Sequence, residues 1–284
     1  MIVPDEKKSR GYITEPIVTM GKPTGVVMAA AAHPDDIEFM MSGTLRLLQR
    51  AGWAVHYLNI ANGSCGSATM NHDETVRTRT AEARESCRRL GAMFHEPLVD
   101  DLMVYYTPEL VARLGAVVRA VKPTILLLQS PQDYMEDHSN SVRLMVTAAF
   151  CRGMPNFATL PPTSPWGGDL AVYHALPYGL RDSLGQPVAA EFYADVTGVM
   201  ADKRALLACH RSQKEWLDVS QGMDSYLNTL TEMGAEVGRR SGRFAFAEGW
   251  RQHLHLGFGP AGFNPLAQAL GPQLLRNPQY PANT

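Results

Sequence analysis

The 284-residue sequence contains few features that would place it in a membrane, an oxidising compartment or a complex with nucleic acid. No apolar run reaches the roughly 18 residues that a transmembrane helix requires. The four cysteines are scattered and form no CxxC pair, which favours reduced thiols over a disulfide framework. A net charge of −2 offers no basic excess for a polyanion, and the polar start MIVPDEKKSRGYITEP lacks the apolar core of a signal peptide. We therefore expect a cytoplasmic protein without nucleic acid or a transmembrane segment.

Two common catalytic signatures are missing from the loops where they would be expected. The segment GSCGS at 63–67 does not have the Gly-x-Ser-x-Gly pattern of a nucleophile elbow. The loop after the first apolar run carries HPDD instead of the Gly-x-Gly-x-x-Gly fingerprint of a dinucleotide site. These absences disfavour a serine or cysteine nucleophile and a nucleotide cofactor.

Apolar strand-like segments alternate with helix-like segments through the first 150 residues. The segments TGVVMAAAA, WAVHYLNIA and TILLLQ have the length and composition of buried strands. Segments with helical spacing follow each of them: 38–52 follows the first, 74–92 and 108–123 follow the second, and 141–153 follows the third. This alternation predicts an α/β fold of the Rossmann-like, doubly wound type, with a mostly parallel sheet and helices on both faces.

The chain is long enough to bury a large core, and its composition changes near both ends. We expect an irregular N-terminal lead-in at 1–23, a single α/β domain at 24–255 and a C-terminal extension at 256–284. The extension contains many helix and strand breakers, which predicts packing on the surface or on a partner.

Two loops carry metal-type side chains directly after predicted strands. The first is His33-Pro34-Asp35-Asp36, and the second is the segment DYMEDH at 133–138. Sites in doubly wound folds form at the carboxyl ends of the strands, so the loops lie side by side if both strands are central and parallel. His33, Asp36 and His138 could then hold one ion, and three protein ligands plus a water is the arrangement of a catalytic zinc site.

Plainer interpretations exist for each loop alone. A histidine at a strand end is often only a hydrogen-bonded polar residue, and Asp35 or Asp36 could cap the following helix. The matching positions of the two loops favour a site. In that case one aspartate binds the metal, and the other faces the metal-bound water as a general base.

The segment AHPDDIEF at 32–39 resembles the signature of the LmbE-like, or PIG-L, deacetylases, the family of N-acetylglucosaminyl-phosphatidylinositol de-N-acetylase. Four later segments resemble other parts of that family in the same order, so the resemblance spans about residues 24–215. These segments are LNIANGSCGS, RTAEARESCRRLGA, DHSNSVRL and DKRALLACHRSQ.

The resemblance implies a zinc-dependent hydrolase that removes the acetyl group from an N-acetylated amino sugar or its conjugate, although another divalent metal is an alternative. His33, Asp36 and His138 would be the metal ligands, and Asp35 would be the general base. Arg79 would help to bind the substrate, unless it belongs to a solvated helix face. The partner would be a small molecule, and the chain could form a homo-oligomer.

Two departures from the family pattern concern the substrate. The family's second motif is often His-Pro-Asp-His, and Met135 stands where its first histidine helps the oxyanion or the leaving group. Tyr134, Glu136, Asp137 or a distant histidine would then have to replace it, or the step would rely on zinc alone. The candidate histidines are His210, His253 and His255. Ser64 stands where many members have glutamate, in a loop expected to line the pocket.

Two further functions remain open at this point. One is an amidase for a larger N-acyl conjugate, and the other is a metal- or sugar-binding protein that has lost turnover. Trp216 and Trp250 could stack on a sugar ring, although packing in a core or an interface is the stronger interpretation.

Overall fold

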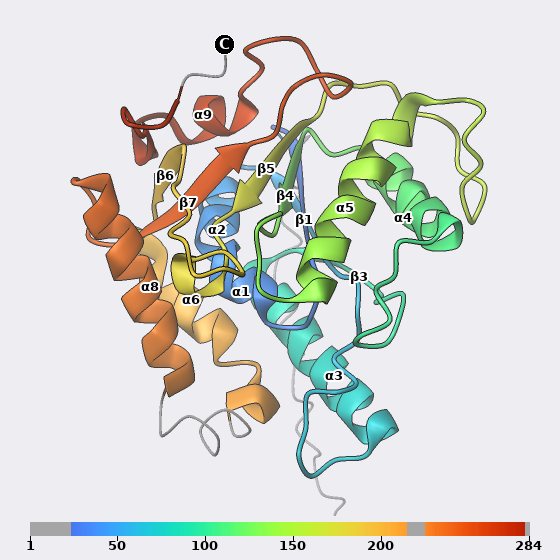
Figure 1. The fold of residues 1–284 in the computed structure, drawn as a ribbon, viewed down its shortest axis with the longest axis horizontal. Coiled ribbons are helices and arrows are strands. Elements are labelled where there is room, and N and C mark those ends of the chain that lie inside the picture. The colour runs from blue at the N-terminus through green and yellow to red at the C-terminus, as the bar shows by residue number, and fades with distance from the viewer. Residues whose placement is uncertain (1–23, 215–224, 282–284) are drawn as a thin grey trace, which may run out of the picture.

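The structure, a computed structural model, describes residues 24–214 and 225–281, so the predicted lead-in at 1–23 and Trp216 lie outside the described residues. Its centre is an eight-stranded mixed sheet in the order β3-β2-β1-β4-β5-β7-β6-β8 (Figure 1). The strands are β1 (Val26–Ala31), β2 (Ala54–Asn59), β3 (Met93–His95), β4 (Ile125–Leu128), β5 (Ala171–Ala175), β6 (Phe192–Asp195), β7 (Ala247–Gln252) and β8 (Leu274–Arg276).

The sheet has a parallel part and an antiparallel part. β3, β2, β1, β4 and β5 pair in parallel, whereas β7 runs antiparallel to β5 and to β6, and β8 runs antiparallel to β6. The parallel part reverses its winding direction beside β1 and β4, where such folds place their sites.

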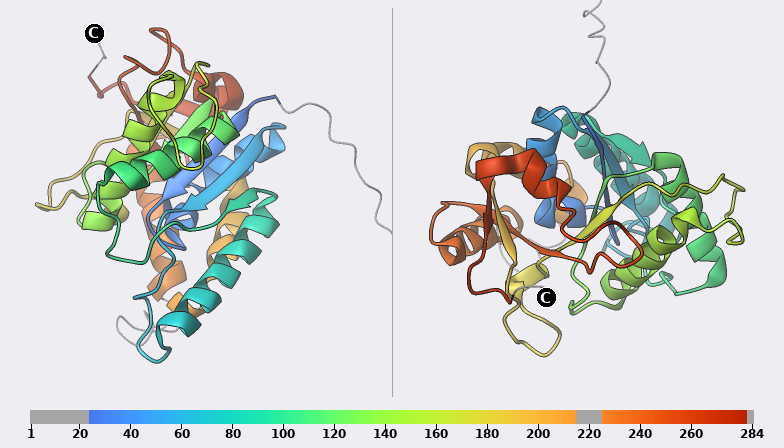
Figure 2. Two further views of the ribbon diagram at one scale, coloured as in Figure 1. Left: turned by 90° about the vertical axis from the view of Figure 1, so that its right-hand side faces the viewer. Right: turned by 90° about the horizontal axis from the view of Figure 1, so that it is seen from above.

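Helices cover both faces of the sheet, as the alternating sequence pattern predicted (Figure 2). Successive β1 residues point to opposite faces, so that Val27 and Ala29 join one core cluster while Met28 and Ala30 join the other. The helices are α1 (Asp36–Met40), α2 (Ser42–Arg50), α3 (His72–Leu90), α4 (Pro108–Val121), α5 (Glu136–Phe150), α6 (Met200–Leu207), α8 (Ser225–Ser241) and α9 (Pro265–Leu270).

Three local features differ from the sequence-based expectation. The single helix predicted at 38–52 is divided into α1 and α2, because Met41 has the non-helical dihedrals φ −134° and ψ −20°. α5 begins at Glu136, so His138 lies in the first turn of a helix and not in a loop. β8 pairs with β6, and Leu266 of α9 joins the main core, so the segment predicted as an extension contributes to the sheet and core.

Cys87 and Cys209 are free and buried. Among the described residues, the helices are too short or too polar to cross a bilayer.

Candidate metal centre and active site

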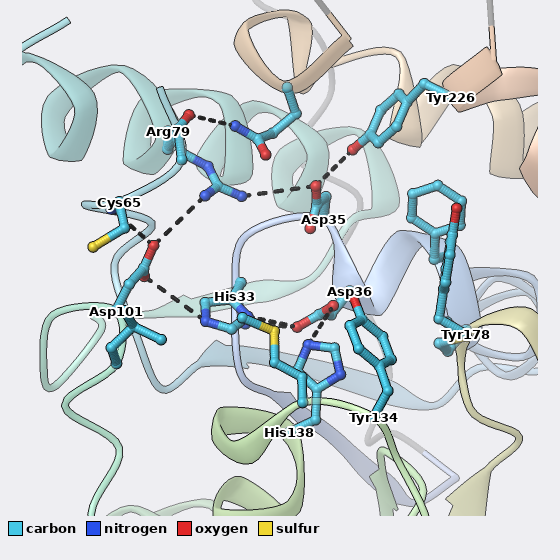
Figure 3. A pocket seen from close by; sticks show the side chains of 16 residues that line it. His33, Asp35, Asp36, Cys65, Arg79, Asp101, Tyr134, His138, Tyr178 and Tyr226 are labelled. Carbon is cyan, nitrogen blue, oxygen red and sulfur yellow. Dashed lines mark hydrogen bonds and ion pairs between the residues drawn. The ribbon is translucent and has the colours of Figure 1, made fainter. Parts of the chain in front are cut away.

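Three metal-type side chains from two neighbouring strand ends meet in one buried group. His33 follows β1, Asp36 is the first residue of α1, and His138 lies in the first turn of α5, which follows β4. Because β1 and β4 are adjacent and parallel, the segments after them converge. One ligand atom from each side chain lies within 4.8 Å of the others (Figure 3).

Each histidine of this group is oriented by a second carboxylate. His33 Nε2 lies 3.0 Å from Asp137 Oδ2, and His138 Nδ1 lies 2.9 Å from Asp133 Oδ1. The remaining nitrogens face Asp36, with His33 Nδ1 at 3.5 Å from Oδ2 and His138 Nε2 at 3.4 Å from Oδ1. Carboxylate-held imidazoles of this kind are typical of metal-binding histidines. The donor set of two nitrogens and one oxygen therefore fits a divalent metal such as zinc.

The electrostatics of the group also favour a cation. Burial alone would lower the pKa of His33, but hydrogen bonds to Asp137 and Asp36 outweigh it and raise the pKa to about 10. The pKa of His138 is also raised, because Asp36 and Asp133 outweigh the effect of burial. Although burial disfavours its charged form, the two histidines hold the pKa of Asp36 below its ordinary value. The acidic side chains therefore supply negative charge that a bound metal ion would neutralise.

Asp35 points into the pocket from a strained backbone position. Its φ of 107° and ψ of −24° lie at the edge of the left-handed region, which an aspartate tolerates better than most side chains. Its carboxylate makes no capping hydrogen bond to α1 and instead accepts one of 2.8 Å from the Tyr226 hydroxyl. The interpretation of Asp35 as a helix cap is therefore wrong.

Arg79 of α3 lies behind Asp35 and is only 3% exposed, so it does not belong to a solvated helix face. Its guanidinium donates to the Pro34 carbonyl at 2.6 Å and to the Gly63 carbonyl at 3.2 Å. It also lies 3.7 Å from Asp35 Oδ2. Burial raises the pKa of Asp35, and the positive charge of Arg79 opposes this shift without cancelling it. Arg79 thus fixes the HPDD turn and sets the electrostatics around Asp35.

Asp101 is a site residue that the sequence-based reasoning missed. Its carboxylate accepts hydrogen bonds from Gly63 N at 2.7 Å and Cys65 N at 3.0 Å. It also lies 3.8 Å from Arg79 Nη1 and 4.0 Å from His33 Nε2. Asp101 therefore ties the glycine-containing loop to the metal-binding group.

The candidates for the role of the missing histidine occupy different places. Met135 lines the pocket, as does the adjacent and largely exposed Tyr134. Neighbouring protein atoms desolvate the Tyr134 hydroxyl and carboxylates lie near it, which raises its pKa to about 12. Asp137 is engaged with His33 and with Leu102 N. His210 is fully buried beside Glu38, with 3.3 Å between Nε2 and Oε1, and is not among the residues that line the pocket. Of the three, only Tyr134 is placed to reach a bound molecule.

The pocket around this group has a volume of about 410 Å³, and Tyr134, Tyr178 and Tyr226 lie on the side away from Cys65 and Asp101 (Figure 3). Cys65 and Gly66 line it next to Ser64, which instead accepts a hydrogen bond from Asp101 N. Trp250 is completely buried and donates to Thr44, so it is a core residue and not a sugar-stacking one. The lining residues are His33, Asp35, Asp36, Phe39, Met40, Cys65, Gly66, Arg79, Asp101, Leu102, Tyr134, Met135, His138, Tyr178, Gln213 and Tyr226.

Comparisons with known proteins agree with the family resemblance seen in the sequence. Residues 28–150 match the PIG-L family, described as GlcNAc-PI de-N-acetylase. The diacetylchitobiose deacetylase of Thermococcus kodakarensis is 28% identical over 238 residues, which cover 79% of this chain and 82% of that protein. The 4-oxalmesaconate hydratase of Pseudomonas putida is 22% identical over 244 residues, which cover 81% of this chain and 90% of that protein.

A solved structure shares the fold. The N,N'-diacetylchitobiose deacetylase of Pyrococcus horikoshii superposes with a TM-score of 0.69 at 23% identity, covering 85% of this chain and 88% of that one. The predicted Rossmann-like α/β architecture is thereby confirmed.

Proposed function

Because residues 28–150 match the PIG-L family, we propose that the chain is a metal-dependent N-deacetylase acting on an N-acetylated amino sugar or its conjugate. The observation that carries this proposal is the arrangement of Asp35 beside the group formed by His33, Asp36 and His138. That arrangement combines a set of candidate metal ligands, a carboxylate that faces the cavity and a pocket large enough for a small molecule.

A zinc ion or similar divalent metal held by His33, Asp36 and His138 would supply a Lewis acid for the amide carbonyl and would lower the pKa of water. Asp35 would take the proton of the attacking water, and two observations support this role: its side chain faces the pocket and does not cap α1. Tyr226 and Arg79 hold this carboxylate in position.

The departing amine requires a proton, and Met135 cannot donate one. Asp35 can return the proton that it has taken, which its raised pKa favours. Tyr134 offers a second donor, since a hydroxyl with a pKa of about 12 keeps its proton at neutral pH. The methionine therefore does not prevent turnover.

The hydratase relative suggests a second candidate, the addition of water to an unsaturated carboxylate. A polyanionic substrate needs several free cationic side chains in its pocket. Among the described lining residues only Arg79 carries a fixed positive charge, and its guanidinium is already bonded to two carbonyls and adjacent to Asp35. The charge of the pocket therefore favours the hydrolysis of a neutral amide.

The test combines metal analysis with acetate release. Zinc-loaded protein is incubated with a panel of N-acetyl amino sugars and their glycosides, and with amides that carry longer acyl groups. We expect release of acetate from at least one N-acetyl sugar, and loss of bound zinc in His33→Ala and His138→Ala. The control His72→Ala changes an exposed histidine outside the group and should retain zinc.

Different outcomes separate the alternatives. Cleavage of only the longer amides would identify an amidase for larger conjugates. Bound zinc without cleavage of any amide would overturn the enzymatic proposal and leave a binding protein. Retention of zinc in both histidine variants would show that the ligands are assigned wrongly.

A further inference from the structure

A continuous row of aromatic rings forms one wall of the pocket. Tyr226 contacts Phe39 with ring centroids 5.1 Å apart, Phe39 contacts Tyr178 at 5.5 Å, and Tyr178 contacts Tyr134 at 6.4 Å. Tyr134 in turn meets His138 edge to face at 5.7 Å. We call Tyr226, Phe39, Tyr178 and Tyr134 the aromatic wall.

The aromatic wall extends from the general base to the metal-binding group. At one end the Tyr226 hydroxyl donates to Asp35, and at the other Tyr134 packs on His138 (Figure 3). All four of its members line the cavity. An amide held between Asp35 and His138 would lie alongside these rings, which places one of its substituents within reach of them.

The polar groups opposite the wall are largely committed to the protein itself. Both oxygens of Asp101 accept backbone N–H groups, and the Arg79 guanidinium donates to two carbonyls. Gln213 donates its amide to the Gly66 carbonyl at 2.7 Å. A hydroxyl-rich second sugar would lose hydrogen bonds to water and would find few uncommitted partners among Asp101, Arg79 and Gln213. An apolar group makes no hydrogen bonds to water, so it would lose none on entering the pocket.

The apolar surface continues to the mouth of the pocket. Tyr134 is 61% exposed and Leu102 is 52% exposed, although both line the cavity. Large apolar side chains kept at the rim of a site mark a surface that a ligand covers. The group that lies on the aromatic wall therefore reaches outward from the reacting amide towards solvent.

We propose that the substrate is an amino-sugar conjugate whose non-sugar part is a flat aromatic group, and that the aromatic wall is its binding subsite. This inference rests on the proposed deacetylase function for the position of the amide. Offset-stacked and edge-to-face contacts with several rings would select an aromatic substituent over an aliphatic or a hydroxylated one of similar size.

The test compares two substrates that differ only in the substituent, the methyl and phenyl β-glycosides of N-acetylglucosamine. We expect kcat/KM for acetate release by the zinc-loaded enzyme to be about ten-fold or more higher for the phenyl glycoside. The phenyl-to-methyl ratio should fall towards one in Tyr134→Ala and in Tyr178→Ala. Tyr105→Ala removes an exposed tyrosine that does not line the cavity and should keep the ratio.

Binding measurements keep this inference separate from the proposed function. Calorimetric dissociation constants of both glycosides are measured on the same zinc-loaded protein. A ten-fold preference for the phenyl glycoside without acetate release would support the subsite and count against deacetylation. Equal affinities and equal rates for the two glycosides would overturn the subsite. A preference that survives in both tyrosine variants would overturn it as well.

Discussion

The Tyr226 hydroxyl donates a hydrogen bond of 2.8 Å to the carboxylate of Asp35, although 191 positions separate the two residues in the sequence. Tyr226 lies at the start of α8, and Asp35 lies immediately before α1. The contact therefore joins the second half of the chain to the proposed general base.

We expect Tyr226→Phe to lower kcat by about ten-fold, because a hydrogen bond to a charged group contributes roughly 1.5–3 kcal/mol. Burial raises the pKa of Asp35, whereas the Tyr226 hydrogen bond lowers it, so removing the hydroxyl should raise it further. Because the base acts deprotonated, the acidic limb of the kcat/KM profile should move to higher pH. Bound zinc, measured in parallel, should not change.

Tyr193→Phe is the matched control for this variant. Its hydroxyl contacts Asn277 and does not line the pocket, so the pH profile should stay that of the wild type. An unshifted acidic limb in Tyr226→Phe would mean that this hydroxyl does not act on the base.

The two adjacent aspartates should respond differently to the same substitution. Asp36→Asn should lose bound metal, because Asp36 faces both ligand histidines. Asp35→Asn should retain metal and lose at least about 100-fold in kcat, the lower range for a general base. Metal content and turnover measured on the same preparations check both statements. Loss of metal in Asp35→Asn would mean that the two roles are reversed.

The meeting of His33, Asp36 and His138 in one group could be predicted from the sequence because the three residues stand next to strand ends. His33 and Asp36 follow an apolar run, and His138 follows another, and the α/β alternation brings such ends together. The structure differs from the prediction in the element that carries His138, since this residue belongs to the first turn of α5 and not to a loop.

Asp101 and Tyr226 could not be found in the same way, for two physical reasons. β3 has only three residues and is partly exposed, so no apolar run in the sequence indicates the strand that precedes Asp101. The role of Tyr226 depends on how α8 packs against the first half of the chain, and local periodicity does not specify such a distant contact. Short strands and long-range packing thus limited how many residues of the site could be predicted from the sequence.

A buried ion pair beneath the pocket predicts a pH-dependent stability. Glu38 Oε1 lies 3.3 Å from His210 Nε2, and both side chains are almost completely buried. We expect Glu38→Gln to lower the free energy of unfolding by about 3 kcal/mol at pH 6, because it leaves His210 without its charge partner. Urea titrations of both proteins measure the difference.

The sign of the pH dependence follows from the two pKa shifts. Burial lowers the pKa of His210, but Glu38 outweighs this effect and raises the pKa above 6.5. The contribution of His210 to the free energy of unfolding is therefore fully present below pH 6.5 and is lost as pH rises through its folded pKa. Against the effect of burial, His210 lowers the pKa of Glu38 below 4.5, so the contribution of Glu38 is present above pH 4.5. The difference in unfolding free energy between the two proteins should therefore narrow as pH rises through the folded pKa of His210.

Glu85→Gln serves as the control for this pair. Glu85 forms exposed ion pairs with Arg88 and Arg89, which contribute little to stability. A Glu38→Gln difference as small as that of Glu85→Gln would show that Glu38 and His210 are not an ion pair in the folded protein.

Gly66 tests whether the position of Arg79 controls Asp35. A Cβ at Gly66 would overlap Arg79 Nη1 and would lie 2.9 Å from Gln213 Nε2. Because this overlap is too close to be accommodated in place, the guanidinium must shift and weaken its hydrogen bonds to the Pro34 and Gly63 carbonyls. Gly66→Ala should therefore move the positive charge of Arg79 away from Asp35. Because Arg79 lowers the pKa of the Asp35 carboxyl, this change should move the acidic limb of the kcat/KM profile to higher pH.

We expect Gly66→Ala to reduce kcat/KM by about ten-fold at neutral pH, since one charge-assisted contact to the base is weakened. Bound zinc should be retained, because Arg79 does not contact the metal-binding group. Gly167→Ala is the control, as an added Cβ there has no atom within 4 Å and should leave the rate unchanged. If Arg79→Lys lowers kcat/KM while Gly66→Ala does not, the loop that contains Gly66 moves to accommodate the added Cβ and the guanidinium stays in place. If neither variant shifts the pH profile, Arg79 holds the turn without influencing the base.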